Sequence, residues 1–301
     1  MLLSNDTETF RLLIENASRD LRIAQLFIEK DFYAISILKE LINRDNNFVF
    51  KGGTSLSVCQ RLINRFSEDI DISYAVDHIT TSQKRKIKQI FFDSIEASSL
   101  SVSNPEDIRS RRVFNRYLCP YKSIFNEMGD KVIVEWSIKT TSYPIEEKVA
   151  QTIIGRYLES IKRNDLIEKY ELGPFVVKTI CKERTLVDKI FAICDYHIYK
   201  KLERQSRHIY DIFHLLKYVA LDEQFITLFK SVKQDRIPLI NTPSASGDTP
   251  VSVILYDLIK EETFKPDYLK MTTILIYDQI KYDDCISSIL RIADFLKQNN
   301  L

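Results

Sequence analysis

The chain has 301 residues, of which 45% are hydrophobic and 28% are charged, and its formal net charge is +1. This balance is typical of a folded protein and excludes a disordered chain, and the length is sufficient for a full core and two domains. Because the chain has no overall basic excess, a nucleic-acid partner would have to be bound by a local patch.

Cysteine and histidine usage gives no sign of a disulfide framework or a zinc site. The five cysteines are scattered without a C-x-x-C pair, and the four histidines lack metal-ligand spacing. We therefore expect reduced thiols that fill core space. The N-terminus does not resemble a signal peptide, and no run of about 18 apolar residues occurs. The sequence thus predicts a cytoplasmic protein without a membrane partner.

The first predicted elements are two helices between Asp6 and about Arg44. Apolar residues recur there at helical spacing, glycine and proline are absent, and Asp6 or Thr7 is a suitable N-cap. We expect the charged triplet Glu29, Lys30 and Asp31 between these helices. Two interpretations remain open for it: structural ion pairing, or a contribution of Lys30 or Asp31 to an active site.

The stretch from Phe48 to Ser73 has the pattern of a strand, a tight glycine turn, a helix and a second strand. The turn is Gly52-Gly53, and the second strand carries Asp69 and Asp71. Because side chains alternate along a strand, these two carboxylates should share one face. Two neighbouring carboxylates repel, so a bound divalent cation such as Mg²⁺ or Mn²⁺ explains the pair best.

The glycine turn complements this pair, because free backbone N–H groups at a helix start can bind phosphate. Gly52 and Gly53 would allow the phosphate to approach, and the hydroxyls of Thr54 and Ser55 lie beside them in the sequence. A Walker loop is excluded, since Lys51 precedes the glycines. The alternatives are ordinary turn glycines and two exposed acids on a strand edge.

Arg65 and Ser67, which precede the second strand, each have both a structural and a functional interpretation. Ser67 lies two residues before Asp69 and should share its face, where it could contact metal or phosphate. Arg65 could neutralise a phosphate.

The middle of the chain predicts a helix over Thr80–Ala97, a loop over Ser98–Asp107 and a strand over Lys131–Lys139. Between the loop and the strand, basic residues alternate with aromatic ones, which suits a nucleic-acid groove but is also typical of a solvated face. These basic residues are Arg109, Arg111, Arg112 and Arg116.

The C-terminal part is predicted to be mostly helical after a linker at Asn164–Pro174 and a short apolar stretch at Phe175–Ile180. The expected helices cover Glu183–Lys201, Arg204–Val219, Asp222–Val232, Val251–Glu262 and about Ile286 to Gln298.

Several blocks together resemble the nucleotidyltransferase toxins of the AbiEii type, which include the MenT toxins. The most specific block joins the glycine turn to the D-x-D strand; the others are weak singly. They are Lys51-Gly-Gly-Thr-Ser-Leu with Arg65-Phe-Ser-Glu-Asp-Ile-Asp, Glu29-Lys-Asp-Phe-Tyr, Thr185-Leu-Val-Asp-Lys and Arg207-His-Ile-Tyr-Asp.

The resemblance implies further site residues. Enzymes of this fold place a third acid beside the D-x-D strand, and Glu135, inside an apolar strand, is the best candidate for a catalytic metal ligand; a rim residue facing water is the alternative. Lys189 would lie near the nucleotide phosphates. Asp211 would be catalytic, unless it only pairs with Arg207. The family block has an aspartate where this chain has His208, which leaves Asp211 as its matching acid.

The resemblance implies an α+β fold, with a nucleotidyltransferase domain over residues 1–174 and a helical bundle over 175–301 that closes over its mouth. The implied enzyme transfers NMP from an NTP to an acceptor, by family analogy the 3′ end of tRNA, within a toxin–antitoxin or abortive-infection system. The cognate antitoxin would be a protein partner. Transfer to a protein hydroxyl and an inactive nucleotide- or RNA-binding module are the alternatives.

Overall fold

The chain forms two compact units in a computed structural model that describes residues 2–67, 69–75, 79–110, 112–138 and 143–301. Unit 1 consists of Met1–Gln60 and Ser67–Thr179, and unit 2 consists of Arg61–Phe66 and Ile180–Leu301. The short segment Arg61–Phe66 therefore belongs to unit 2, although its sequence neighbours on both sides belong to unit 1. Our expected boundary after Pro174 differs because the strand that follows it belongs to the sheet of unit 1.

Unit 1 begins with a short 3₁₀ turn, Leu3–Asn5, and the two expected helices, α1 (Thr7–Leu21) and α2 (Gln25–Arg44). Asp6 is the N-cap of α1, where its side chain accepts a hydrogen bond from the Thr9 N–H at 3.2 Å. Most residues of α2 between Ile28 and Leu41 are buried, because this helix packs into the core of the unit.

The sheet of unit 1 has six strands in the order β3-β4-β2-β1-β6-β5. Strands β1 and β2 pair antiparallel, as do β3 and β4, whereas β2 pairs parallel with β4 and β1 pairs parallel with β6. The sheet is therefore mixed, and β2 lies between β1 and β4. The strands are β1 (Phe48–Lys51), β2 (Asp69–Tyr74), β3 (Phe114–Tyr121), β4 (Asp130–Ser137), β5 (Ile145–Ala150) and β6 (Phe175–Ile180).

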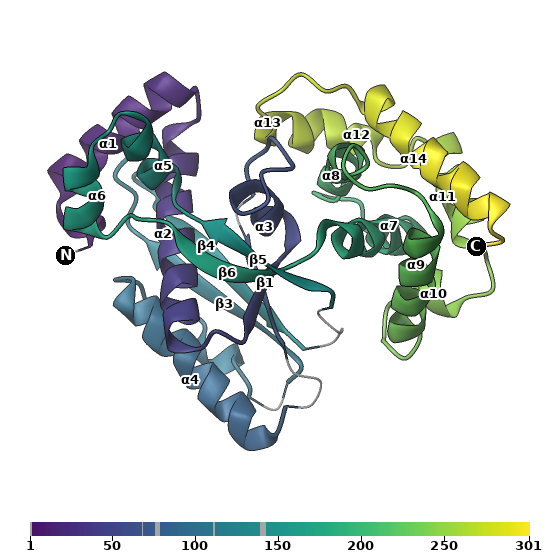
Figure 1. The fold of residues 1–301 in the computed structure, drawn as a ribbon, viewed down its shortest axis with the longest axis horizontal. Coiled ribbons are helices and arrows are strands. Elements are labelled where there is room, and N and C mark those ends of the chain that lie inside the picture. Colours follow the sequence, from purple (N-terminus) through teal and green to yellow (C-terminus); the bar gives the residue numbers. More distant parts are fainter. Residues whose placement is uncertain (1, 68, 76–78, 111, 139–142) are drawn as a thin grey trace. The chain divides into compact units, whose positions relative to one another are not determined.

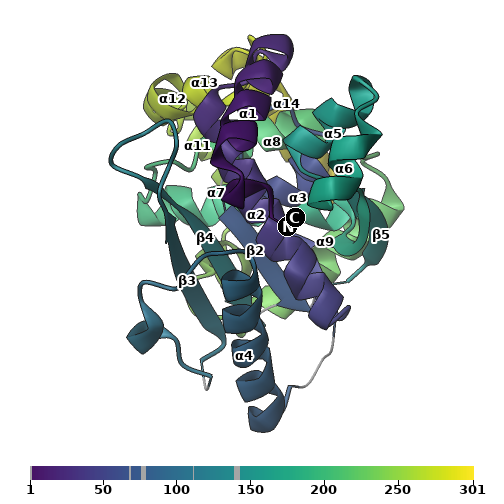
Figure 2. The same ribbon diagram turned by 90° about the vertical axis from the view of Figure 1, so that its left-hand side faces the viewer.

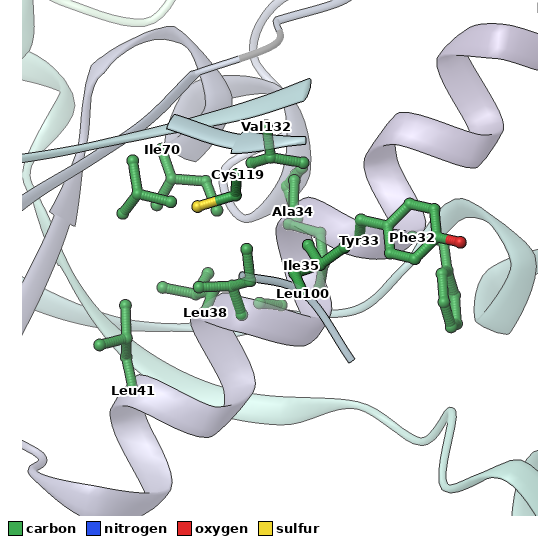
Figure 3. Packing of buried hydrophobic residues seen from close by; sticks show 14 of the residues in the cluster. Phe32, Tyr33, Ala34, Ile35, Leu38, Leu41, Ile70, Leu100, Cys119 and Val132 are labelled. Atoms are coloured by element: carbon green, nitrogen blue, oxygen red, sulfur yellow. The ribbon is translucent and has the colours of Figure 1, made fainter. Parts of the chain in front are cut away.

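Helices α2 and α4 (Thr81–Ala97) cover one face of this sheet (Figures 1 and 2). Phe91 of α4 stacks on Tyr117 of β3 at 4.8 Å between ring centroids and also contacts Trp136 of β4. Figure 3 shows side chains of α2, among them Leu38, packed toward Ile70 of β2. The core of unit 1 thus lies between these two helices and the sheet. The remaining helices of the unit are α3 (Gly52–Val58), η2 (Pro105–Asp107), α5 (Ile153–Ser160) and α6 (Asn164–Tyr170).

The described elements of unit 2 are helical, apart from the end of β6. Phe191 of α7 (Lys182–Tyr199) stacks on Phe229 of α9 (Glu223–Arg236) with 4.8 Å between ring centroids, and both rings are buried. The other helices are α8 (Arg207–Leu215), α10 (Pro243–Ser246), α11 (Val251–Lys260), α12 (Lys265–Asp267), a π-helical turn (Tyr268–Thr272), α13 (Thr273–Leu275) and α14 (Tyr282–Gln298).

Some expectations about secondary structure were wrong. The predicted linker Asn164–Pro174 contains helix α6, and strand β3, which includes Arg116, was not predicted. Arg111 and Lys139 lie outside the described residues. All five cysteines are free thiols, as expected. Within the described ranges, every helix is too short or too polar to cross a bilayer.

The triplet Glu29, Lys30 and Asp31 lies inside α2, not between two helices as expected, and each side chain has a structural contact within unit 1. Glu29 accepts hydrogen bonds from Ser123 and Ile124, and Lys30 pairs with Asp130 at 3.2 Å. Asp31 accepts the N–H of Ile153 at the start of α5, at 2.6 Å. Buried polar groups need such partners, so the structural interpretation accounts for all three residues.

Asp31 should make the stability of unit 1 depend on pH. Burial raises its pKa to about 6, against opposing effects of Arg156 and the Ile153 N–H. The folded pKa exceeds the value of 3.8 expected without these effects, so the neutral form of the Asp31 carboxyl group favours the folded state. Its contribution to the free energy of unfolding is fully present below about pH 4. It should then be lost as the pH rises to about 6, which lowers the free energy of unfolding by up to about 3 kcal/mol.

Asp31→Asn keeps an acceptor for the Ile153 N–H and should remove this part of the pH dependence. Urea unfolding of both proteins between pH 4 and 7 measures it, with Asp283→Asn, an exposed change in α14, as the control. Parallel curves for Asp31→Asn and the unchanged protein would contradict the assignment.

Candidate active site

The centre of the candidate site is the turn where β1 runs directly into α3. Gly52 has a φ of +76°, in the region that glycine adopts without strain. A Cβ atom at this position would lie only 2.0 Å from Oδ2 of Asp71. The carboxylate of Asp71 therefore lies against the glycine turn, in space that any other residue at position 52 would fill.

Asp69 and Asp71 are presented on one face of β2 because the alternating residues are held in the core. Ile70 and Ile72 are fully buried, whereas both aspartates are partly exposed. In the paired strands, Lys51 of β1 lies opposite Asp71, and Glu135 of β4 lies on its other side. The strand geometry therefore places both aspartate side chains on one face of β2, as the sequence pattern predicts.

The residues around the turn have internal hydrogen bonds. Thr54 donates its hydroxyl to the Asp69 carbonyl oxygen at 2.5 Å, which fastens α3 to the start of β2. Ser55 donates to the carbonyl oxygen of Gly52 at 3.2 Å, and both hydroxyl-bearing residues are buried. Gly53 is the second residue of α3, and Ser67 is partly buried just before β2. Contact of a phosphate with Gly52, Gly53, Thr54, Ser55 or Ser67 stays a prediction.

Glu135 has a partner that the sequence analysis did not identify. Arg116 of β3 lies opposite Glu135 in the antiparallel pair, and its Nε and Nη2 atoms lie 2.7 and 2.6 Å from Oε1 of the carboxylate. A row of four charged residues thus crosses four adjacent strands: Lys51, Asp71, Glu135 and Arg116. The alternation of strand side chains could have suggested Arg116, but its strand was missed.

The donor set on this face fits a hard divalent cation. Asp69 and Asp71 supply oxygen ligands, and Mg²⁺ in proteins is held by one or two carboxylates, with phosphate oxygens and water completing the shell. No group of three acidic, histidine or cysteine side chains with metal-binding geometry occurs among the described residues. The arrangement therefore fits a cation shared with a substrate better than a closed protein cage. Glu135 as a third ligand stays a prediction.

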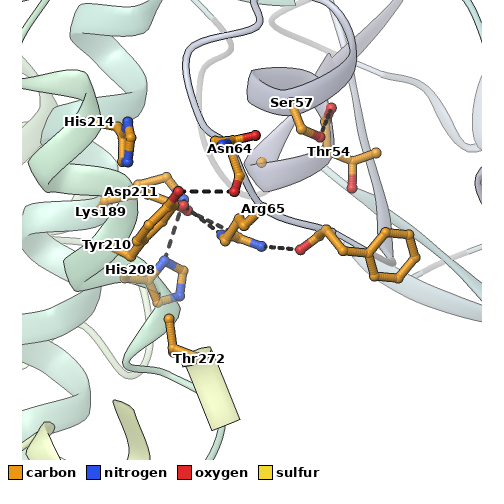
Figure 4. Close-up of polar contacts among 12 residues, drawn as sticks. Thr54, Ser57, Asn64, Arg65, Lys189, His208, Tyr210, Asp211, His214 and Thr272 are labelled. Carbon is orange, nitrogen blue, oxygen red and sulfur yellow. Dashed lines mark hydrogen bonds and ion pairs between the residues drawn. The ribbon is translucent and has the colours of Figure 1, made fainter. Parts of the chain in front are cut away.

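A second cluster of predicted site residues lies inside unit 2 (Figure 4). Arg65 donates two hydrogen bonds of 2.7 Å to Asp211 of α8, from Nε to Oδ1 and from Nη2 to Oδ2. Lys189 of α7 donates to the same Oδ2 at 2.7 Å. All three residues are buried. The structure thus gives Asp211 two cationic partners, Arg65 and Lys189, that sequence spacing could not reveal.

The charges of this cluster explain its protonation. Burial alone would raise the pKa of Asp211, but the neighbouring charges of Arg65 and Lys189 lower it well below its usual range. Burial lowers the pKa of Lys189, an effect that Asp211 opposes. Burial and the charge of Lys189 lower the pKa of His208 strongly, so its ring is neutral at pH 7. The Nδ1 atom of His208 lies 3.5 Å from Nζ of Lys189 and can accept a hydrogen bond from it.

Arg65 also holds the chain segment in which it lies. Its Nη1 donates to the Phe66 carbonyl oxygen at 2.8 Å, and the Phe66 N–H donates to the Leu275 carbonyl oxygen at 2.8 Å. Tyr210 donates its hydroxyl to the carbonyl oxygen of Asn64 at 3.0 Å. These contacts give Arg65 a structural part within unit 2. Its predicted contact with phosphate, like those of Lys189 and Asp211, stays a prediction.

Asp211→Asn should destabilise the protein strongly, because it leaves the buried cations Arg65 and Lys189 without their counter-charge. The free energy of unfolding should fall by about 3–5 kcal/mol at pH 7. Because the pKa of Asp211 is lowered in the folded state, its contribution is present above about pH 4 and is lost at lower pH. The difference in free energy of unfolding between Asp211→Asn and the unchanged protein should therefore be smaller at pH 3 than at pH 7, and denaturant unfolding at both pH values measures it.

The control is Glu261→Gln, which removes an exposed ion pair with Lys200 in the same unit. It should leave the unfolding midpoint almost unchanged, since exposed pairs contribute little. Equal midpoints for Asp211→Asn and the unchanged protein would contradict the role assigned to the cluster.

Solved structures that are similar to this chain include two from Helicobacter pylori. The crystal structure of JHP933 has 14% sequence identity and a TM-score of 0.48, over 90% of this chain and 93% of that one. The second, titled "Crystal structure of putative nucleotidyltransferase from H. pylori", has 14% identity and a TM-score of 0.48, over 92% of this chain and 97% of that one. A search among curated proteins gives no match.

The family comparison covers most of the chain. The model described as nucleotidyl transferase AbiEii toxin, type IV TA system, matches residues 36–281. This range includes the glycine turn, the two aspartates of β2 and the Arg65–Asp211–Lys189 cluster, and it confirms the resemblance found in the sequence motifs. The chain therefore belongs to the AbiEii nucleotidyl transferase toxin family of type IV toxin–antitoxin systems.

Proposed function

We propose that this chain is a metal-dependent toxin that transfers NMP from an NTP to the 3′ end of an RNA, with tRNA as the acceptor. The observation that carries the proposal is the position of Asp71, which shares a face of β2 with Asp69 and lies against the Gly52 turn. Carboxylates beside a glycine turn suit a substrate that brings both phosphates and a divalent cation. Family membership supports nucleotidyl transfer as the reaction.

In the proposed reaction, the acceptor hydroxyl oxygen forms a bond to the α-phosphorus of the NTP. The bond from that phosphorus to the oxygen bridging to the β-phosphate breaks, pyrophosphate leaves with the electron pair, and the hydroxyl loses its proton to solvent water. Bound Mg²⁺ or Mn²⁺ would neutralise the triphosphate and acidify the hydroxyl. Asp69 and Asp71 would orient these groups, and Thr54 keeps the turn fastened to β2 through the Asp69 carbonyl.

Further parts of the proposal rest on the motifs and on family membership. Lys189 and Asp211 are proposed to act on the nucleotide, because the blocks that contain them resemble those of the family, apart from His208, and lie within the matched range 36–281. A cognate antitoxin is expected as a protein partner, since the family belongs to toxin–antitoxin systems. We place the reaction in the cytoplasm, where the free thiols of all five cysteines would stay reduced.

Label transfer tests the reaction directly. The full chain is incubated with Mg²⁺, total tRNA and each α-³²P-labelled NTP in turn, and we expect label to join the RNA. Periodate-oxidised tRNA, which lacks the 3′ diol, should accept none. Asp69→Asn should reduce transfer at least about a hundredfold, because it removes an electrostatic contact to the reacting groups. Asp283→Asn, an exposed change in α14, should leave the rate unchanged.

Other outcomes of this experiment are equally informative. Label that runs with protein would show that the acceptor is a protein hydroxyl and would refute the RNA part of the proposal. Binding of NTP without transfer under any divalent cation would point to a binding module and would refute the enzyme assignment.

Gly52→Ala tests the geometry of the turn. The new Cβ would have to displace Asp71 from a distance of 2.0 Å, and the positive φ adds backbone strain of about 1–2 kcal/mol. A shift of about 1 Å in a reacting group can cost about a hundredfold in rate, so we expect transfer to fall by that order.

Gly173→Ala is the matched control, because its nearest neighbour, Cγ2 of Ile167, lies at an ordinary contact distance of 4.0 Å. Transfer rates and thermal unfolding are measured for both variants. A Gly52→Ala protein that is folded and transfers label at the normal rate would mean that Asp71 does not act at the turn.

A further inference from the structure

The Arg116–Glu135 pair has an unsymmetrical geometry. Both nitrogen contacts of the guanidinium, from Nε and from Nη2, end on the same oxygen, Oε1. Within the described part of the chain, the hydrogen bond to this carboxylate ends on Oε1, and Oε2 accepts none. A pair formed only for charge neutralisation could use both oxygens in a bidentate fork. Here one oxygen is fixed and the other remains available.

The stability of the sheet does not explain this pair. The Arg116 side chain is 56% exposed and that of Glu135 is 21% exposed. Exposed ion pairs contribute about 0–1 kcal/mol, and a cross-strand pair is within the same range. Arg116 can therefore be replaced without unfolding the protein, so a different role for it can be tested.

The position of the pair relates it to the two aspartates. Glu135 lies opposite Asp71 in the parallel pairing of β4 with β2, and in a parallel pair opposite residues point to the same face. Arg116 comes from β3, the strand at the edge of the sheet, and its carbonyl oxygen accepts a hydrogen bond from Asn104 at 3.0 Å. The guanidinium thus extends from an anchored backbone position toward the outer side of Glu135.

We propose that Arg116 is a positioning residue for Glu135: it holds Oε1 and so presents Oε2 to a divalent cation bound by Asp69 and Asp71. This inference rests on the proposed function, which supplies the cation. It extends that function by assigning a role to a residue that contacts neither substrate nor metal. Partners that orient a metal ligand commonly change metal affinity by about 10–100-fold when they are removed.

The sign of the effect separates this role from a simple surface charge. Arg116→Gln removes a positive charge near the cation, and by electrostatics alone this change should strengthen cation binding. If Arg116 positions Glu135, the same variant should weaken binding, because the free carboxylate loses its orientation. The two explanations therefore predict opposite changes in the dissociation constant.

The experiment is a titration of the full chain with Mn²⁺ alone, without nucleotide, followed by the electron paramagnetic resonance signal of the free ion. We expect Arg116→Gln to raise the dissociation constant about tenfold. Arg116→Lys keeps the charge but has only one nitrogen, so it should restore part of the affinity. Thermal unfolding should be the same for all variants.

Two further proteins complete the test. In the Glu135→Gln background, Arg116→Gln should cause no additional loss, since the ligand that it positions is already gone. Lys148→Gln is the matched control: it removes a partly exposed cation that lies 3.0 Å from Glu146 elsewhere in unit 1, and it should not affect Mn²⁺ binding.

The proposal is overturned if Arg116→Gln binds Mn²⁺ as tightly as the unchanged protein or more tightly. It is also overturned if its effect persists in the Glu135→Gln background, or if the unchanged chain binds no Mn²⁺. This readout needs no turnover. A failure of label transfer with normal Mn²⁺ binding would therefore count against the proposed function and not against the role of Arg116.

Discussion

The alternation of side chains along β2 is the constraint on which the candidate site depends. Ile70 and Ile72 are fully buried against the helices, and this burial leaves one possible face for Asp69 and Asp71. A register slip by one residue would place two carboxylates in the core and two isoleucines outside, at a cost of several kcal/mol. The same hydrophobic packing that stabilises unit 1 therefore also orients the acids.

Neighbouring strands add charged residues on both sides of the two aspartates. Because β2 lies between β1 and β4, Asp71 has Lys51 opposite it on one side and Glu135 on the other. The outer cation, Arg116, completes a row in which two negative charges lie between two positive ones. Such a row reduces the repulsion between the carboxylates when no cation is bound.

The sequence predicted the local features of this site well and the long-range ones poorly. The strand, the turn and the helix around Gly52 were recognisable because alternation, a glycine pair and helical spacing are local signals. Strand β3 was missed because the basic and aromatic residues around its start suggested a nucleic-acid groove, and α6 was missed because the nearby Gly173 and Pro174 suggested a linker. The sequence analysis also did not identify Arg116 as the partner of Glu135, since strand pairing decides that contact.

The Arg65–Asp211–Lys189 cluster shows why such contacts lie beyond sequence reasoning. Arg65 and Asp211 are 146 positions apart, and no spacing rule links them. Burying Arg65, Lys189 and Asp211 costs desolvation energy that hydrophobic residues of similar volume would avoid, and the contacts of Asp211 with both cations offset part of that cost. The neutral ring of His208 beside Lys189 adds no further charge to desolvate. The cluster therefore depends on contacts between distant segments that form only when unit 2 folds.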